Sequence, residues 1–126
     1  MKQIWIVDDD QEMAAAVTLM LQMLRHSARH FLGARLAAKE LLDGQRPDLL
    51  LLDISMPEVT GIMMLEFIRR RPEWSDLPVV MLSSEATETQ VDEALNLGAD
   101  GYVMKPATID ELESAIQAAW QKHSKE

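Results

Sequence analysis

Hydrophobic and polar positions along this chain alternate between two kinds of pattern. Short continuous apolar runs occupy residues 4–7, 49–52, 79–82 and 102–104, and runs of this length are typical of strands that are buried on both faces. Residues 27–32 form a more polar run, which is typical of a strand at the edge of a sheet. The pattern therefore predicts five strands, the second of them at an edge.

The segments between these runs carry apolar residues at the spacing of a helix. From Met13 to Leu24 they recur at intervals of three and four residues, which predicts a helix with one apolar side. Asp10 precedes this helix and is expected to cap it. Four further helices are predicted, beginning at residues 34, 60, 87 and 108 and ending by residues 44, 71, 98 and 120. The last two are expected to begin with capping boxes, Thr87 with Gln90 and Thr108 with Glu111.

The strict alternation of strands and helices determines the fold class that we expect. An α/β chain of this kind forms a parallel sheet with helices on both faces. A length of 126 residues is typical of one domain, so residues 1–126 are expected to fold as a single unit. The chain contains no cysteine, which excludes disulfides and thiolate metal sites and fits a reducing cytosol.

Charge and hydropathy argue against two classes of function. The formal net charge is −9 at pH 7, whereas binding to nucleic acid phosphates requires clustered Lys and Arg. The basic run from Arg69 to Arg71 is therefore interpreted as a solvated helix end. The longest apolar runs fall far short of the roughly 20 residues that a membrane-spanning helix needs, and the start of the chain lacks the features of a signal peptide. We expect a cytoplasmic protein that binds neither nucleic acid nor membrane.

Two histidines lie in or beside the second predicted strand. Neither His26 nor His30 has an acidic residue or a histidine at the spacing of metal ligands. A solvated position on the surface is therefore predicted for both.

Polar side chains capable of chemistry stand where the buried strands end. Because the carboxyl ends of parallel strands meet at one edge of the sheet, these side chains are expected to lie close together, at the edge where open α/β sheets bind ligands. They are Asp8, Asp9 and Asp10 after the first strand, Asp53 after the third, Ser83 after the fourth and Lys105 after the fifth.

This combination of side chains favours phosphoryl chemistry. Neighbouring carboxylates repel one another, and a hard divalent cation with oxygen ligands, Mg²⁺ or Mn²⁺, relieves that repulsion. Lys105 adds an ammonium group and Ser83 a hydroxyl donor, and both can contact the oxygens of a phosphoryl group. Asp53 is the predicted nucleophile, and its phosphorylation would give an aspartyl phosphate.

The motifs of the chain, in their order and spacing, resemble those of the receiver domains of bacterial two-component response regulators, of the chemotaxis-protein-like kind. The resemblance extends from Lys2 to about Lys122. It implies a flavodoxin-like (βα)5 fold, a doubly wound α/β architecture whose five parallel strands follow the order 2-1-3-4-5. The motifs are Val7-Asp8-Asp9-Asp10, Leu52-Asp53-Ile54-Ser55-Met56-Pro57, Thr60-Gly61, Ser83-Ser84-Glu85 and Gly98-Ala99-Asp100-Gly101-Tyr102-Val103-Met104-Lys105-Pro106.

The resemblance also implies a role for each side chain of the cluster. Asp53 would accept a phosphoryl group from a sensor histidine kinase or a phosphotransfer protein. Lys105, whose bond to Pro106 is typically cis in the family, would pair with the phosphoryl oxygens. Such a domain promotes only its own phosphorylation and autodephosphorylation and is not a conventional enzyme. The implied ligands of Mg²⁺ are the carboxylates of Asp8, Asp9 and Asp53 and the backbone carbonyl of Ser55.

A change of state at the phosphoryl group is expected to reach a distant face of the domain. Ser83 would move toward the phosphoryl group and Tyr102 inward behind it, which would remodel the face formed by the fourth helix, the fifth strand and the fifth helix. A downstream protein or effector domain would bind this face, and homodimerisation through it is a further expectation. Ser55, Ser84 and Glu85 occupy positions that tune the phosphoryl lifetime in the family, and Ser84 stands where Ala or Gly is usual.

Two other interpretations use parts of the same pattern. Asp8 and Asp10 also resemble the acidic pair of haloacid-dehalogenase-like phosphatases, in which Asp8 rather than Asp53 would be the nucleophile. That family places a further acidic pair at a later strand end, whereas no such pair follows Lys105. The third interpretation is an unphosphorylated protein-binding scaffold on the same fold, which the complete set of site residues disfavours.

Overall fold

The computed structural model of the chain describes residues 2–124. Its centre is a parallel sheet in the order β2-β1-β3-β4-β5, which confirms the order implied by the family resemblance and the edge position predicted for the second strand. The strands are β1 (Gln3–Val7), β2 (Ser27–Phe31), β3 (Leu49–Asp53), β4 (Val79–Ser83) and β5 (Gly101–Met104).

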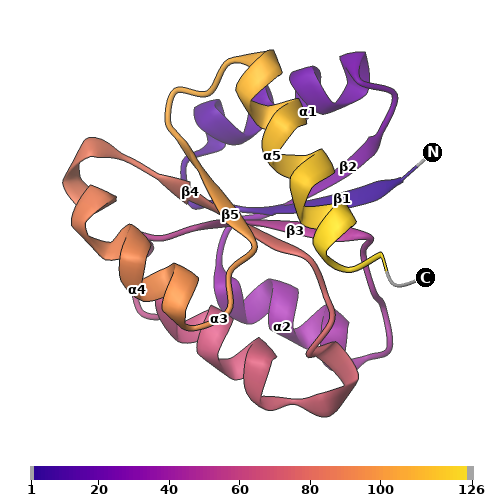
Figure 1. The fold of residues 1–126 in the computed structure, drawn as a ribbon, viewed down its shortest axis with the longest axis vertical. Helices are drawn as coiled ribbons and strands as arrows, with labels where there is room; N and C mark the ends of the chain where they lie inside the picture. Colours follow the sequence, from indigo (N-terminus) through magenta and orange to yellow (C-terminus); the bar gives the residue numbers. More distant parts are fainter. Residues whose placement is uncertain (1, 125–126) are drawn as a thin grey trace.

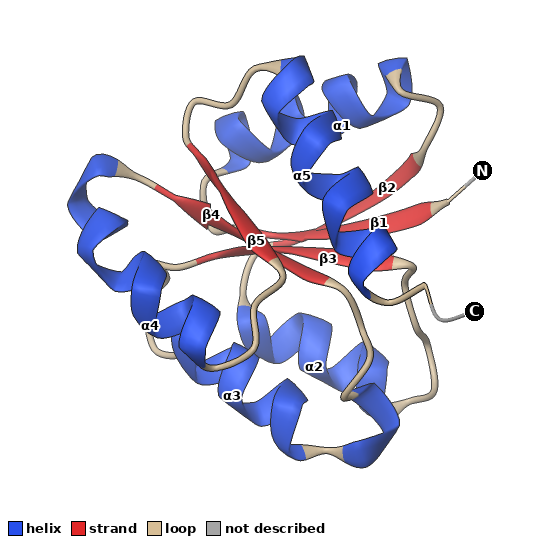
Figure 2. Ribbon diagram, in the orientation of Figure 1, coloured by secondary structure: helices blue, strands red, loops and turns tan. Residues whose placement is uncertain are grey.

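Helices cover both faces of this sheet, as predicted. Figures 1 and 2 show α1 and α5 on one face and α2, α3 and α4 on the other. The α-helices are α1 (Gln11–Met23), α2 (Ala34–Leu42), α3 (Gly61–Arg70), α4 (Val91–Asn96) and α5 (Ile109–Lys122), and two 3₁₀ helices are η1 (Pro72–Trp74) and η2 (Glu85–Gln90). Among the described helices, none is long and apolar enough to cross a membrane.

The central strand β3 separates two hydrophobic cores. Successive side chains of a strand point to opposite faces. Leu50 and Leu52 accordingly belong to the core shared with α2, α3 and α4, whereas Leu49 and Leu51 belong to the core shared with α1 and α5. All four are completely buried, and burial of a leucine side chain contributes roughly 1.5–3 kcal/mol. The packing on both faces thereby fixes Asp53, the last residue of β3.

Two of the predicted helix starts are confirmed. Asp10 caps α1, because its carboxylate accepts the backbone N–H groups of Glu12 and Met13 at 3.1 Å each. The capping box of Thr108 and Glu111 opens α5, with both of its hydrogen bonds at 3.1 Å. The Lys105–Pro106 peptide bond is cis, as the resemblance implies.

The predicted capping box of Thr87 and Gln90 is wrong. The box is formed by Ser84 and Thr87, and it opens η2 instead of α4. The reason is the direction of the Thr87 side chain, which is buried and whose hydroxyl accepts the backbone N–H of Ser84 at 2.9 Å. The α-helical segment consequently begins later than predicted, at Val91.

The basic run at the end of α3 is only partly a solvated helix end. Arg70 is exposed as predicted, but the side chain of Arg69 is only 14% exposed. Its guanidinium donates to the carbonyl oxygens of Gly98 and Trp74 and forms a 3.1 Å ion pair with Asp100. The prediction is therefore wrong for Arg69, because the loop between α4 and β5 folds over this side chain.

The predicted solvated position of His26 is also wrong. Its ring is half-buried and packs edge-on against Trp120, with ring centroids 5.3 Å apart. Burial lowers the pKa of His26 below its usual value.

Candidate functional site

The predicted strand-end side chains come from four neighbouring strands. Asp8 follows β1, Asp53 ends β3, Ser83 ends β4 and Lys105 follows β5. In the sheet register, Asp53 lies beside Leu82 and Ser83 lies beside Met104. All four strand ends therefore face the carboxyl edge, where open α/β sheets bind ligands.

Lys105 connects two buried carboxylates at this edge. Its Nζ lies 3.1 Å from Asp53 Oδ1 and 3.3 Å from Asp8 Oδ2. Asp8 is completely buried and Asp53 is 3% exposed. The backbone N–H of Asp10 donates to the other oxygen of Asp8 at 2.9 Å. Three of the predicted site residues are thus in direct contact.

A third carboxylate completes an oxygen cluster. Asp8, Asp9 and Asp53 each offer a carboxylate oxygen, and these oxygens lie within 4.8 Å of one another. The Asp10 carboxylate is engaged in capping α1, so the acidic pair of the phosphatase interpretation is not assembled. The cluster consists of hard oxygen ligands and carries more negative charge than one lysine neutralises, and both properties fit Mg²⁺.

This imbalance of charge shifts the pKa values of Asp53 and Lys105. Burial, followed by the Asp8 carboxylate, raises the pKa of Asp53 to about 7, while Lys105 acts in the opposite direction. Burial alone would lower the pKa of Lys105, but the adjacent carboxylates of Asp53 and Asp8 outweigh burial and raise it. Lys105 therefore remains an ammonium ion between two acids.

Gly61 allows α3 to approach the phosphoacceptor candidate. A Cβ atom at this position would overlap the backbone carbonyl of Asp53. The Gly61 N–H donates to the carbonyl oxygen of Ile54 at 2.9 Å, and Thr60 caps the helix through its bond to the N–H of Met63. The absence of a side chain at Gly61 is thus a condition for the position of Asp53.

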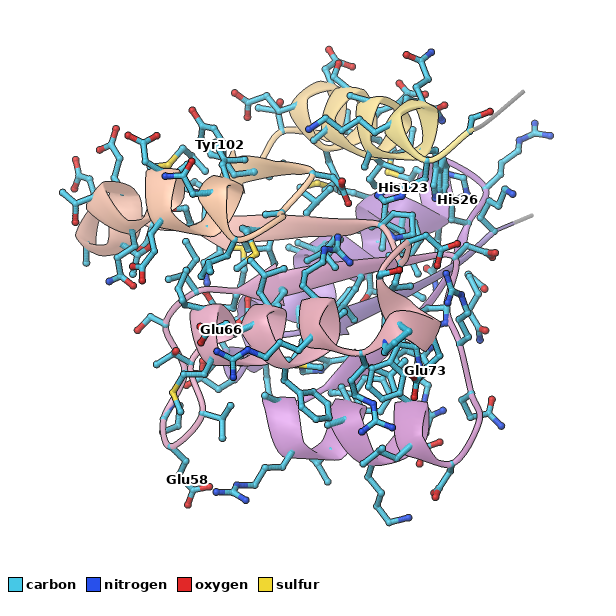
Figure 3. All side chains as sticks on the ribbon, turned by 60° about the horizontal axis from the view of Figure 1, so that its bottom comes forward. His26, Glu58, Glu66, Glu73, Tyr102 and His123 are labelled. Carbon is cyan, nitrogen blue, oxygen red and sulfur yellow. The ribbon has the colours of Figure 1, made fainter. Side chains whose placement is uncertain are left out.

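The remaining predicted site residues differ in their exposure. Ser55 is exposed in the loop after β3, and Glu85 is the exposed first residue of η2. Tyr102 is 46% exposed on β5, and Figure 3 shows its side chain between the ribbons of α4 and α5. Ser83 is completely buried, and its hydroxyl lies 3.1 Å from that of Thr87.

His30 belongs to the surroundings of the site, contrary to its predicted solvated position. It is half-buried on β2, and its Nε2 lies 2.7 Å from the backbone carbonyl oxygen of Asp8. This contact depends on the register that pairs His30 with Ile6. The sequence contains no signal for that register, because the polar partner of the histidine among residues 2–124 is a backbone atom.

Comparison with known families matches residues 4–117 to the response regulator receiver domain. The chain belongs to this family. The receiver domain is 34% identical over 126 residues to the KDP operon transcriptional regulatory protein KdpE of Escherichia coli, covering 98% of this chain and 53% of that protein. It is 32% identical over 120 residues to the chemotaxis protein CheY of Pseudomonas aeruginosa, covering 95% of this chain and 97% of that protein.

Solved structures agree with this assignment. The signal receiver domain of a signal transduction histidine kinase from Syntrophus aciditrophicus superimposes with a TM-score of 0.85 at 26% identity, covering all of this chain and 96% of that one. The flavodoxin-like strand order is thus that of a receiver domain. The receiver domain spans about half the length of KdpE and nearly all of CheY.

Membership of the family establishes the general function. Receiver domains are switches in phosphorylation-dependent two-component signalling rather than conventional enzymes. They bind Mg²⁺ in an acidic pocket, and Asp8, Asp9 and Asp53 form an acidic group in this chain that could hold a metal ion. They interact with histidine kinases and with downstream effector domains.

Proposed function

We propose that Asp53 is the phosphoacceptor of a single receiver domain spanning residues 1–126. Its phosphoryl group would come from a phosphohistidine on a sensor histidine kinase or a phosphotransfer protein in the cytoplasm. The observation that carries this proposal is the position of Lys105, whose ammonium bridges buried Asp53 and Asp8 at the carboxyl edge of the sheet.

In the proposed transfer, a carboxylate oxygen of Asp53 forms a bond to phosphorus as the bond from phosphorus to the histidine nitrogen breaks. The electron pair of the broken bond stays on the histidine nitrogen, which leaves as an imidazole. Asp53 attacks in its deprotonated form, and Lys105, next to it, donates to the phosphoryl oxygens. Transfer of the phosphoryl group to water would end the signal.

The proposed metal ligands are the carboxylates of Asp8, Asp9 and Asp53 and the backbone carbonyl of Ser55. These are the oxygen ligands that Mg²⁺ and Mn²⁺ prefer. When bound, the ion supplies the positive charge that offsets the carboxylates and the phosphoryl oxygens. The elevated pKa of Asp53 in the metal-free domain supports this assignment.

The proposed output is a change in the face formed by α4, β5 and α5. Ser83 would donate to the phosphoryl group, and the exposed Tyr102 would turn inward. A downstream protein or effector domain would bind this face, and a second copy of the domain is the alternative occupant. Ser55, Ser84 and Glu85, which flank the cluster, would tune the phosphoryl lifetime.

The experiment that tests the proposal is intact-mass spectrometry after incubation with Mg²⁺ and a small phosphodonor such as acetyl phosphate. The wild-type domain should gain one phosphoryl group, and Asp53→Asn should gain none. Asp10→Asn is the matched control, because it removes an acid of the same run while asparagine still caps the helix. Equal labelling of wild type and Asp53→Asn would refute the assignment.

A further inference from the structure

The turn after β4 holds three hydroxyl groups in contact. Ser83 Oγ lies 3.1 Å from Thr87 Oγ1 and 3.3 Å from the carbonyl oxygen of Ser84. Thr87 Oγ1 also lies 3.3 Å from Ser84 Oγ and accepts the backbone N–H of Ser84 at 2.9 Å. Ser83 is completely buried and Thr87 is 5% exposed. Thr87 is therefore the common partner of both serines.

The number of protons in this cluster limits what Ser83 can do. A serine or threonine hydroxyl carries a single proton. The Thr87 hydroxyl donates to the Ser84 carbonyl oxygen at 3.3 Å, so we assign Ser83 as the donor in its contact with Thr87 Oγ1. Both acceptors of the Ser83 proton then lie in the turn. The oxygens of a phosphoryl group are acceptors, so a hydrogen bond from Ser83 to that group requires the same proton. Ser83 therefore has to withdraw its proton from the turn when it binds a phosphoryl group.

Thr87 also fixes the start of η2. It is the third residue of the capping box that Ser84 opens, and one atom, Oγ1, serves both this box and the contact with Ser83. η2 leads directly into α4 at Val91. A change in the bonding of Thr87 Oγ1 therefore reaches the first turn of the helical segment on the proposed output face.

We propose that the Thr87 hydroxyl is a latch on Ser83. In the unphosphorylated domain it holds the Ser83 hydroxyl in the turn. When Ser83 leaves for the phosphoryl group, Thr87 Oγ1, which accepts the Ser84 N–H in the capping box of η2, loses its bond to Ser83. Thr87 is a positioning residue, since it acts on the phosphoryl group only through Ser83. The inference rests on the proposed function of Asp53.

Thr87→Val tests the latch, because valine keeps the branched shape and lacks the hydroxyl. The affinity of the full chain for beryllofluoride with Mg²⁺, a phosphoryl mimic, is measured by isothermal titration calorimetry. Loss of one competing neutral hydrogen bond predicts binding that is about threefold to tenfold tighter. Thr87→Ser keeps the hydroxyl and should bind as the wild type does, and Thr87→Val should have no effect in a Ser83→Ala background.

Each outcome of the titration decides a specific point. A purely structural role for Thr87 predicts weaker or unchanged binding in Thr87→Val, and that result would overturn the latch. An equal gain in affinity with and without Ser83 would also overturn it. Failure of the wild type to bind beryllofluoride would instead overturn the proposed function, and the latch with it.

A second measurement keeps the latch testable if Thr87→Val does not fold. Amide hydrogen exchange at Ser84 reports the bond from its N–H to Thr87 Oγ1. Addition of beryllofluoride and Mg²⁺ should accelerate this exchange in the wild type and leave it unchanged in Ser83→Ala. Equal protection of the Ser84 amide with and without the mimic in the wild type would contradict the latch.

Discussion

Replacement of Asp53 by asparagine is predicted to stabilise the metal-free domain increasingly as the pH rises. Burial and the Asp8 carboxylate raise the pKa of Asp53 from 3.8 to about 7, against the opposing effect of Lys105. At pH values between the unfolded and the folded pKa of Asp53, the folded state binds more protons than the unfolded state, so the free energy of unfolding falls as the pH rises. The contribution of Asp53 is therefore most favourable below the unfolded pKa and is lost as the pH rises to the folded pKa.

The size of the effect follows from the two pKa values. A difference of one in pKa corresponds to about 1.4 kcal/mol, so the range from 3.8 to about 7 corresponds to roughly 4 kcal/mol in the free energy of unfolding. Of this, about 2 to 3 kcal/mol should be lost between about pH 5 and about pH 8. Asparagine stays neutral throughout, so the stability of the variant relative to wild type should rise by this amount.

The assay is urea unfolding in EDTA, followed by circular dichroism at the two pH values. Asp10→Asn, which removes an exposed acid, should show no comparable change relative to wild type between them. Saturating Mg²⁺ should restore stability to the wild type at the higher pH and much less to Asp53→Asn, because a ligand stabilises the state that binds it. A difference between wild type and Asp53→Asn that does not change with pH would refute the reasoning.

Three further predictions concern the surroundings of the site. Arg69→Ala should lower the free energy of unfolding by about 1–3 kcal/mol. It removes the donor to the carbonyl oxygens of Gly98 and Trp74 and the ion pair with Asp100, although Asp100 keeps its contacts with the Val79 N–H and His123. The exposed Arg70→Ala should change the free energy of unfolding by less than about 0.5 kcal/mol in the same urea titration. Gly61→Ala should lower the free energy of unfolding by about 1–3 kcal/mol and weaken Mg²⁺ binding measured by calorimetry, because the new methyl group would overlap the Asp53 carbonyl. Gly101→Ala is the control, since no atom lies within 4 Å of a Cβ at that position. Equal losses of stability and Mg²⁺ affinity in the two variants would contradict the explanation. Lys105→Met should lower the free energy of unfolding of the metal-free domain by about 3 kcal/mol in alkaline urea titrations, because the two carboxylates lose their positive partner. If the same loss of stability persists in saturating Mg²⁺, which supplies positive charge, a charge effect is refuted.

The sequence alone predicted that the strand ends share one edge, because in a parallel sheet this depends only on the alternation of strands and helices along the chain. Once the apolar runs locate the strands, any parallel sheet brings Asp8, Asp53 and Lys105 to one edge. In the structure, Lys105 Nζ lies 3.1 Å from Asp53 and 3.3 Å from Asp8 at this edge. The proposal of Asp53 as the nucleophile needed only the chemistry of the side chains at that edge.

Contacts that depend on side-chain direction or on loop packing could not be predicted in this way. Thr87 has the spacing of a cap with Gln90, but its side chain turns inward to Ser83. Arg69 looks like its solvated neighbours in the sequence. Its burial depends on Gly98, where a Cβ would lie only 3.1 Å from the guanidinium Nε, and no local pattern links the two residues.

The two cores on either side of β3 have a consequence for how such a domain diversifies. Because the leucines of β3 alternate between the cores, substitutions under α4 meet Leu50 and Leu52, whereas substitutions under α1 and α5 meet Leu49 and Leu51. Each layer can therefore acquire compensating changes without refitting the other, since distant sites combine almost additively. During evolution, such a domain could therefore acquire a new partner on one face of the sheet while the core on the other face stays unchanged. Asp53, at the end of β3, would keep its position in either case.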